Sequence, residues 1–228
     1  MGSMRGDVRC SHIANWTTAS PVNWPRHSGH AEARPRTADR VVVTRVATMA
    51  DLPALQVLIA ASVRGLSAGF YSAVQVEAAL THIFGVDTQL IVDGTYFVID
   101  GATGLVAAGG WSGRHTLYGG DQMKSAEDRL LDPTEEPARI RAFFVHPDRA
   151  RQGLGRQLYE QCERAAWAVG FRGFELMATR PGEPLYLALG FSVVEQVALP
   201  LPGGIEIPLA RMIRPIDPPG MAPDASTG

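Results

Sequence analysis

Apolar residues along the chain recur first at strand-like and then at helix-like spacing. A β-branched run at 40–46 predicts the first strand. Two helices should follow, because Thr48–Asp51 and Ser72–Gln75 are capping-box sequences, and each precedes apolar residues at helical spacing. Two strands, 95–100 and 105–111, then flank a Gly-Ala-Thr-Gly turn, which predicts a β-hairpin. The first half is therefore expected to run strand, helix, helix, strand, strand.

The second half begins after a polar connection, 112–138, which is long for a compact domain unless it serves a site or moves. Ile140–Val145 is apolar on both faces, which indicates a central strand. A long helix should begin near Gly153 and end at Gly170, with an inner stripe of Leu154, Leu158, Cys162, Ala165 and Val169. A strand, a short helix and a final hairpin are predicted at 173–178, 183–189, 191–199 and 205–213. This order favours a mixed sheet with helices on both faces.

Two polar segments bound this pattern. Residues 1–38 lack periodicity and are rich in Pro, Arg, Ser and His, and the opening Met1–Met4 looks like a cloning scar. We therefore expect a scar and disordered leader at 1–38, a single domain at 39–214, and a disordered Pro-rich tail at 215–228.

The charge balance excludes some classes of partner. Lys and Arg total 21 and Asp and Glu total 23, so a net charge of −2 gives no global field for nucleic acid or an anionic membrane. Cys10 and Cys162 have neither disulfide nor metal spacing, so we expect no metal and a cytoplasmic protein. No run of 18 apolar residues is present, and no membrane span is expected.

The segment 143–156 contains the most informative chemistry. A strand ends, a short loop turns, and a helix opens at Gly153 and Gly155, with Arg151 and Arg156 beside them. Free N–H groups and partial positive charge at a helix N-terminus, next to glycines, form a cradle for pyrophosphate. The alternative is that the glycines only allow a helix to pack closely on a sheet. Neither a nucleotide P-loop nor a Rossmann fingerprint fits the spacing.

The whole block resembles the central motif of the Gcn5-related N-acetyltransferase (GNAT) family. Val145-His146-Pro147 followed by Gly153-Leu154-Gly155 matches the family pattern in register, and Tyr186–Phe191 resembles its C-terminal Tyr-x-x-x-Gly-Phe. Ala150 departs from the family's usual Gln or Arg. The resemblance extends over about 41–212. It implies an α/β (α+β type) fold with a mixed, mostly antiparallel sheet of six to seven strands.

The resemblance also implies acetyl-CoA, or another acyl-CoA, as co-substrate. Phe143, Phe144 and Val145 would line the pantetheine and thioester, and a strand N–H near Phe143 or Val145 would polarise the thioester carbonyl. The pyrophosphate would be held by Arg151, Gln152, Gly153, Leu154, Gly155 and Arg156. Tyr186 would act as the general acid toward the leaving thiolate. Alternatively, it packs on the sheet or only hydrogen-bonds the CoA sulfur.

The acceptor site is less specific in sequence. By analogy with the family, Tyr71 and Trp111 are expected to be acceptor-pocket walls, with ordinary core burial as the alternative. Arg141 would bind a substrate carboxylate or pair with an acidic neighbour. His146 is expected to shape the loop, whereas His115 is a candidate for a substrate role. The acidic residues Glu127, Asp128, Asp132, Glu135 and Glu136 solvate the long connection or favour a cationic amine.

The predicted function is therefore transfer of an acetyl group to a primary amine of a small-molecule or amino-acid-like acceptor, directly in a ternary complex. Two alternatives remain open. One is a non-catalytic acyl-CoA sensor on the same fold, and the other is an acyltransferase for a protein amine or charged tRNA. Relatives are often dimers, so a homodimer is a further expectation.

Overall fold

The computed structural model of the chain describes residues 44–123 and 128–216. The expected leader with Cys10, the residues 40–43 of the first strand, Glu127 and the tail from 217 lie outside the described residues. Within them the helices are α1 (Leu52–Leu66), α2 (Ala73–His82), α3 (Thr88–Val92), α4 (Leu154–Ala168) and α5 (Glu183–Ala188). The strands are β1 (Thr44–Val46), β2 (Tyr96–Asp100), β3 (Leu105–Ser112), β4 (Ala138–Val145), β5 (Gly173–Thr179), β6 (Ser192–Leu201) and β7 (Ile205–Pro215).

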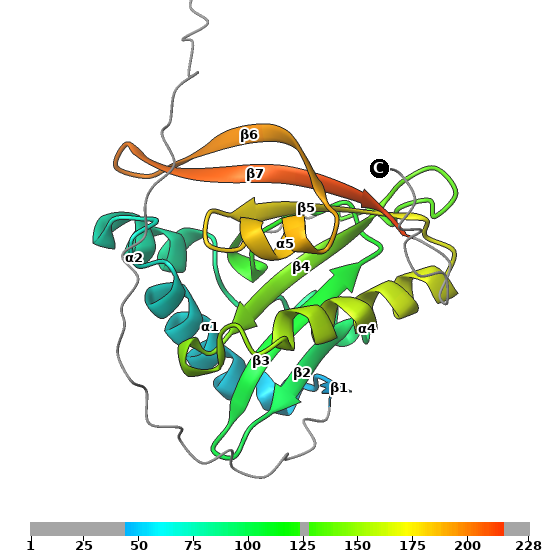
Figure 1. Ribbon diagram of the computed structural model, residues 1–228, viewed down its shortest axis with the longest axis horizontal. Coiled ribbons are helices and arrows are strands. Elements are labelled where there is room, and N and C mark those ends of the chain that lie inside the picture. Colours follow the sequence, from blue (N-terminus) through cyan, green and yellow to red (C-terminus); the bar gives the residue numbers. More distant parts are fainter. Residues whose placement is uncertain (1–43, 124–127, 217–228) are drawn as a thin grey trace, which may run out of the picture. The chain divides into compact units, whose positions relative to one another are not determined.

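The seven strands form one sheet in the order β1-β2-β3-β4-β5-β7-β6 (Figure 1). The neighbours are antiparallel except for β4 and β5, which are parallel. Alternating residues of β2 separate the two faces. Phe97 and Ile99 lie in the core beneath α4, whereas Tyr96 and Val98 lie in the core beneath α1. The expected mixed, mostly antiparallel sheet with helices on both faces is confirmed.

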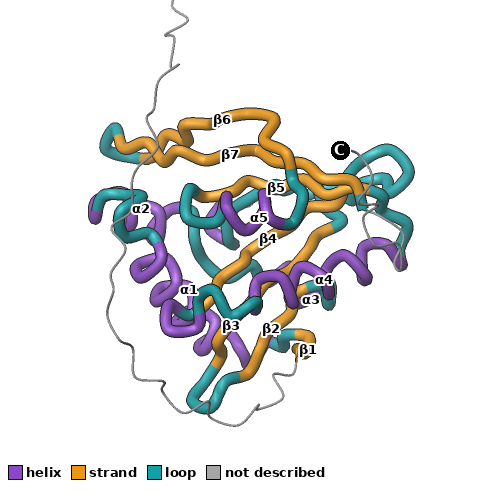
Figure 2. Tube along the Cα trace, viewed as in Figure 1, coloured by secondary structure: helices purple, strands orange, loops and turns teal. Residues whose placement is uncertain are grey.

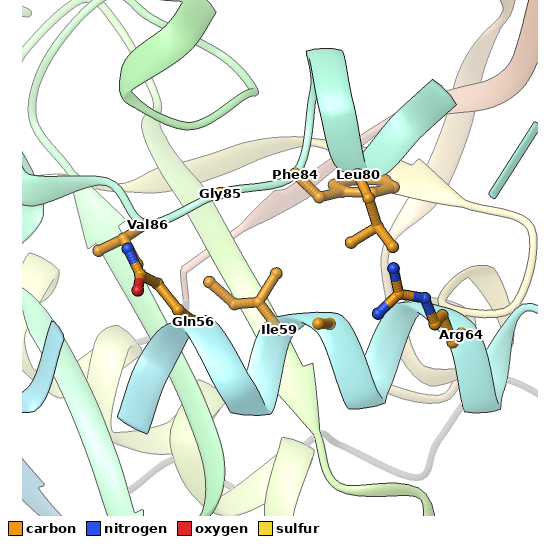
Figure 3. A pocket seen from close by; sticks show the side chains of 8 residues that line it. Gln56, Ile59, Arg64, Leu80, Phe84, Gly85 and Val86 are labelled. Atoms are coloured by element: carbon orange, nitrogen blue, oxygen red, sulfur yellow. The ribbon is translucent and has the colours of Figure 1, made fainter. Parts of the chain in front are cut away.

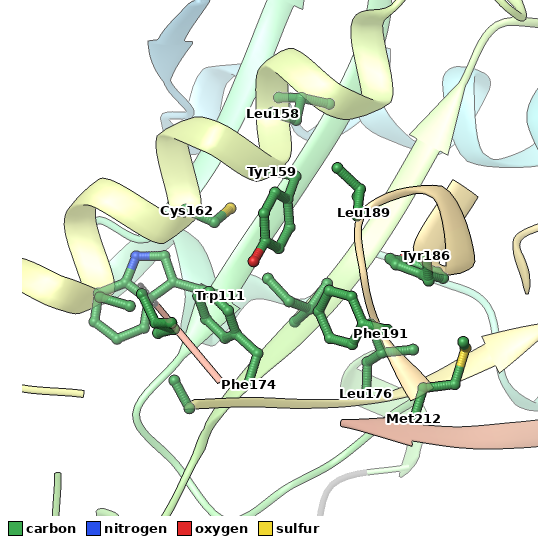
Figure 4. Close-up of a cluster of buried hydrophobic side chains, with 14 of the residues drawn as sticks. Trp111, Leu158, Tyr159, Cys162, Phe174, Leu176, Tyr186, Leu189, Phe191 and Met212 are labelled. Carbon is green, nitrogen blue, oxygen red and sulfur yellow. The ribbon is translucent and has the colours of Figure 1, made fainter. Parts of the chain in front are cut away.

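Local sequence signals account for the helix ends. Both predicted capping boxes form, at Thr48 with Asp51 and at Ser72 with Gln75. The inner stripe of α4 is confirmed for Leu154, Leu158 and Cys162. It is wrong for Val169, which is 56% exposed because it follows the last helical residue. Ala166 is buried on this face as well, and so is Tyr159, which is labelled in Figure 4.

The long connection between β3 and β4 is tied to the domain by polar contacts. Arg114 donates to both carboxylate oxygens of Asp93, at 2.7 and 3.0 Å. The Asp121 carboxylate accepts from the backbone N–H of Thr88, at the start of α3. The sequence pattern did not predict α3, because five residues are too few to show a helical period. The described part of this connection also contains one turn of 3-10 helix at Asp121–Met123, and Figure 2 shows the fold coloured by secondary structure.

The stretch Met49–Leu66 is the one helical segment of the described chain that is long and apolar enough to span a membrane, by length and composition alone. Its residues Leu55, Leu58 and Ile59 are buried together with residues of β2 and β3. That packing is typical of the core helix of a globular domain.

Candidate active site

Strands β4 and β5 separate soon after they meet. They pair only at Ala138 with Phe174 and at Arg139 with Glu175. Beyond these pairs β4 continues to Val145 and β5 to Thr179, and their ribbons diverge (Figure 1). The edge of β4 that faces β5 is therefore unpaired over residues 140–145. An extended ligand can bind to such an edge like an added strand.

A β-bulge bends β4 within this unpaired stretch. The pairing with β3 shifts between Ala108 and Gly110, so that Ala142 and Phe143 both lie opposite Gly109. Ala142 has a φ of +54°, a left-handed conformation that L-residues seldom adopt. A Cβ at Gly109 would lie 2.7 Å from the ring of Phe143, so only glycine leaves room for this ring.

The N-terminus of α4 follows the end of β4 and supplies free backbone donors. Gly153 caps the helix with a φ of +84°, and Arg151 has a φ of +61°. Gln157 is the first residue to donate in helical fashion, to the carbonyl of Gly153. The N–H groups of Leu154, Gly155 and Arg156 thus have no intrahelical acceptor, which suits an anionic group.

The short loop between β4 and α4 is held by His146 and Pro147. The Nδ1 atom of His146 accepts a hydrogen bond from the backbone N–H of Asp148. The backbone N–H of His146 donates to the carbonyl of Val106. Pro147 lies against Gly65 of α1, where an added Cβ would be 2.3 Å from the proline Cγ. These contacts agree with the expectation that His146 shapes the loop.

Tyr186 lies in α5, on the side of the sheet covered by α4. Its ring centroid is 6.3 Å from that of Phe143. The centroid of Phe191, which lies beside Tyr186 in Figure 4, is 5.6 Å away. The residue is 8% exposed, and burial raises the pKa of its phenol well above the usual value of a tyrosine. Tyr186 is therefore held in the protonated state at neutral pH, beside the bulged part of β4.

Comparison with known proteins points to one family. Residues 93–193, which include the separated strands, the α4 N-terminus and Tyr186, match the family model described as acetyltransferase (GNAT) domain. Over this segment the chain is similar to the acetyltransferase domain of the GNAT family. A search of curated proteins finds no match to it.

Solved structures agree with this assignment at the level of the fold. A GCN5-related N-acetyltransferase from Rhodopseudomonas palustris superposes with a TM-score of 0.56 at 16% identity, over 78% of this chain and 98% of that one. The PaiA N-acetyltransferase from Thermoplasma acidophilum, in complex with coenzyme A, gives 0.53 at 14% identity, over 77% and 99%. YncA from Salmonella typhimurium, a putative acetyltransferase with its cofactor acetyl-CoA, gives 0.51 at 19% identity, over 81% and 98%.

The GNAT fold of this chain does not bring the three predicted acceptor residues together. Trp111 pairs with Ile140 near the start of β4, is 6% exposed, and packs on Phe171 in the core beneath α4. Tyr71 lies on the opposite face of the sheet, where its hydroxyl donates to the carbonyl of Pro208 and accepts from the N–H of Arg180.

Arg141 faces inward as well. Its guanidinium forms an ion pair with Asp87 at 2.8 Å, and both side chains are only 2% exposed. It also donates to the carbonyls of Thr116 and Gly119, at 2.7 and 2.6 Å. Two roles were expected for Arg141, binding a substrate carboxylate or pairing with an acidic neighbour. The structure contains the second, because Arg141 pairs with Asp87 at the start of α3.

The other candidates of the long connection take part in local contacts. The backbone N–H of His115 donates to the carbonyl of Arg129. Asp128 accepts from the N–H and hydroxyl of Thr116, and Glu136 pairs with Arg129 at 2.6 Å. These acidic residues thus stabilise the connection itself.

A cavity of about 220 Å³ lies between α1 and α2 (Figure 3). It is lined by Gln56, Ile59, Ala60, Arg64, Leu80, Phe84, Gly85 and Val86. Phe84 separates it from β4, because its ring packs edge-on against Phe144 with centroids 6.2 Å apart. No local pattern in the sequence predicts this cavity, because its walls come from α1 and from the segment 80–86, and the way these pack depends on the whole fold.

Proposed function

We propose that this chain transfers an acetyl group from acetyl-CoA to the primary amine of a small-molecule or amino-acid-like acceptor, directly within a ternary complex. The observation that supports this most is the juxtaposition of two features. The edge of β4 that faces β5 is not paired beyond residue 139, and the free N–H groups of α4 begin at Leu154, nine residues after β4 ends at Val145. A long ligand with an amide-containing arm and a diphosphate matches both.

The diphosphate would lie at the N-terminus of α4. The N–H groups of Leu154, Gly155 and Arg156 would donate to it, and Gly153 leaves space because an added Cβ would meet nothing within 4 Å. Arg151 and Gln152 are exposed at the same turn, and the guanidinium of Arg156 reaches the carbonyl of Ala188. The helix dipole and the arginine charges act in the same direction.

The pantetheine arm would run along β4, where Phe143, Phe144 and Val145 would line it. The donor expected for the thioester carbonyl was a strand N–H near Phe143 or Val145. The N–H of Val145 donates to the hydroxyl of Ser62 at 3.1 Å, which favours Phe143. One such preorganised donor is worth about 3 kcal/mol of barrier.

Tyr186 would provide the proton for the leaving group. The amine nitrogen forms a bond to the thioester carbon, the carbon–sulfur bond breaks, and the sulfur takes the phenolic proton of Tyr186. The proton lost by the amine passes to solvent and then restores the phenol. A correctly placed acid of this kind contributes ~10²–10⁴-fold to the rate. Its position beside Phe143 supports the role.

Two other functions remain as rivals. A non-catalytic acyl-CoA sensor would bind CoA without turnover, and a buried, protonated Tyr186 beside β4 favours the enzyme over it. The other rival is acylation of a protein amine or of charged tRNA. The net charge of −2 disfavours the tRNA acceptor. We further propose a cytoplasmic location, since Cys162 is a free, buried thiol.

The direct experiment is incubation of the purified chain with acetyl-CoA and a panel of amines, read by mass spectrometry. The panel contains small amines, amino acids, N-terminal peptides and aminoacyl-tRNA. A mass gain of one acetyl group on a small amine, with release of free CoA thiol, is the expected result. Tight CoA binding without acetylation of any panel member would favour the sensor, and acetylation only of peptides or tRNA would overturn the acceptor class.

A further inference from the structure

The left-handed residue of the β4 bulge lies between two buried polar contacts. Ala142 has a φ of +54°, which an alanine adopts only when its surroundings hold it there. The residue before it, Arg141, is anchored through its guanidinium. The carbonyl of Ala142 itself accepts a hydrogen bond from the hydroxyl of Tyr96, at 3.3 Å. The bulge is thus constrained on both sides of its unusual residue.

Tyr96 reaches Ala142 across an intervening strand. It lies on β2 and pairs with Gly110 of β3, while β3 in turn pairs with β4. A Cβ at Gly110 would lie 3.1 Å from the Cδ2 atom of Tyr96 and 2.7 Å from the carbonyl oxygen of Thr95. Because Gly110 has no side chain, the ring of Tyr96 has room to cross β3 toward β4. Tyr96 is fully buried, so its hydroxyl has no access to solvent.

The ion pair of Arg141 fixes the other side of the bulge. Its guanidinium joins Asp87, which precedes α3, to the carbonyls of Thr116 and Gly119 in the long connection. Two segments that are far apart in sequence thus converge on one side chain of β4. Because a buried guanidinium is costly unless all its contacts are made, this arrangement has little freedom to shift.

The peptide unit between Ala142 and Phe143 transmits this constraint to the reaction. In a trans peptide the C=O of one residue and the N–H of the next point in opposite directions. The carbonyl of Ala142 points toward Tyr96, in the core beneath α1. The N–H of Phe143 must then point away from Tyr96, toward the side of the sheet where Tyr186 packs.

We propose that Tyr96, together with the Asp87–Arg141 pair, is a positioning element that aims the N–H of Phe143 at the thioester carbonyl. This inference rests on the proposed function, since it assigns a purpose to the bulge only if a thioester lies along β4. None of the three side chains touches the acyl group in this scheme. They act through the backbone of residues 141–143.

The test is the Tyr96→Phe variant of the full chain, which removes one oxygen atom. The first readout is the infrared carbonyl band of protein-bound acetyl-CoA labelled with ¹³C at the acetyl carbonyl. In the wild type we expect this band at lower frequency than in free acetyl-CoA, and in Tyr96→Phe we expect it to return toward the free value. The second readout is kcat with the best amine of the panel, expected to fall about tenfold while the Kd for CoA stays within twofold.

Tyr159→Phe is the matched control, because Tyr159 is also a buried tyrosine whose hydroxyl is hydrogen-bonded, to Glu163 and Arg214. It should lower the unfolding temperature without moving the carbonyl band. Arg141→Lys, which keeps the charge but loses the planar fork, should shift the band in the same direction as Tyr96→Phe.

Two results would overturn the positioning role. One is an unshifted band in the wild-type complex, and the other is a band and kcat that Tyr96→Phe leaves unchanged. Failure of the proposed function looks different, because the wild type would then not bind acetyl-CoA at all or would acetylate no amine.

Discussion

Arg141 and Tyr186 illustrate how burial decides what a polar residue can do. The charge of Arg141 is satisfied by Asp87 and two carbonyls, so its guanidinium is committed inside the domain. Tyr186 is buried among aromatic rings, and the loss of solvation raises the pKa of its phenol. Arg141 is thus fixed within the domain, and Tyr186 keeps its phenolic proton to a higher pH than an exposed tyrosine does.

Replacing Tyr186 with phenylalanine tests its role as the acid. We expect kcat for amine acetylation to fall by about 10²-fold with the Kd for CoA nearly unchanged, because only the proton donor is lost. Because burial raises the pKa of Tyr186 above the usual ~10, its phenol stays protonated through that pH. Wild-type kcat should therefore not decline between about pH 8 and pH 10 through this group. A decline near pH 10 that the phenylalanine variant abolishes would contradict this account.

The elements around the site are tied to one another by side chains that bridge distant segments. Tyr71 is the clearest case, because its hydroxyl joins the α1–α2 loop to the N–H of Arg180 after β5 and to the carbonyl of Pro208 in β7. A single oxygen thus links three elements that border the region where β4 and β5 separate. This linkage differs from the acceptor wall that the sequence suggested, because the hydroxyl is already occupied.

The Tyr71→Phe variant measures that linkage. It leaves a backbone N–H and a carbonyl without their partner, so we expect a loss of about 1–3 kcal/mol in the free energy of unfolding. Denaturant unfolding followed by circular dichroism gives this value. Tyr118→Phe is the control, because Tyr118 lies in the same hydrophobic cluster and its hydroxyl bonds to no described residue. Equal stability of the two variants would show that the Tyr71 bridge contributes nothing.

At the scale of the whole molecule, the sequence predicted what local patterns encode. Both capping boxes and the glycine start of α4 are properties of a few neighbouring residues, and they are confirmed, as is the order of the elements apart from the unpredicted α3. The partner of Arg141 is 54 residues away, and a carboxylate at that distance is identified only once the chain has folded. The β4 bulge and the cavity between α1 and α2 were missed for the same reason, since each depends on how separate elements pack.

The central claim is that the N-terminus of α4 grips the diphosphate of CoA, and calorimetric titration of CoA into the chain tests it most directly. Gly153→Asp places a carboxylate at the cradle, and Gly203→Asp is its matched control, since the two glycines have φ values of +84° and +80° and open space around the missing Cβ. We predict one CoA bound per wild-type chain, binding at least about tenfold weaker in Gly153→Asp, and unchanged binding in Gly203→Asp. No heat with the wild type, or equal affinity in all three proteins, would contradict the claim.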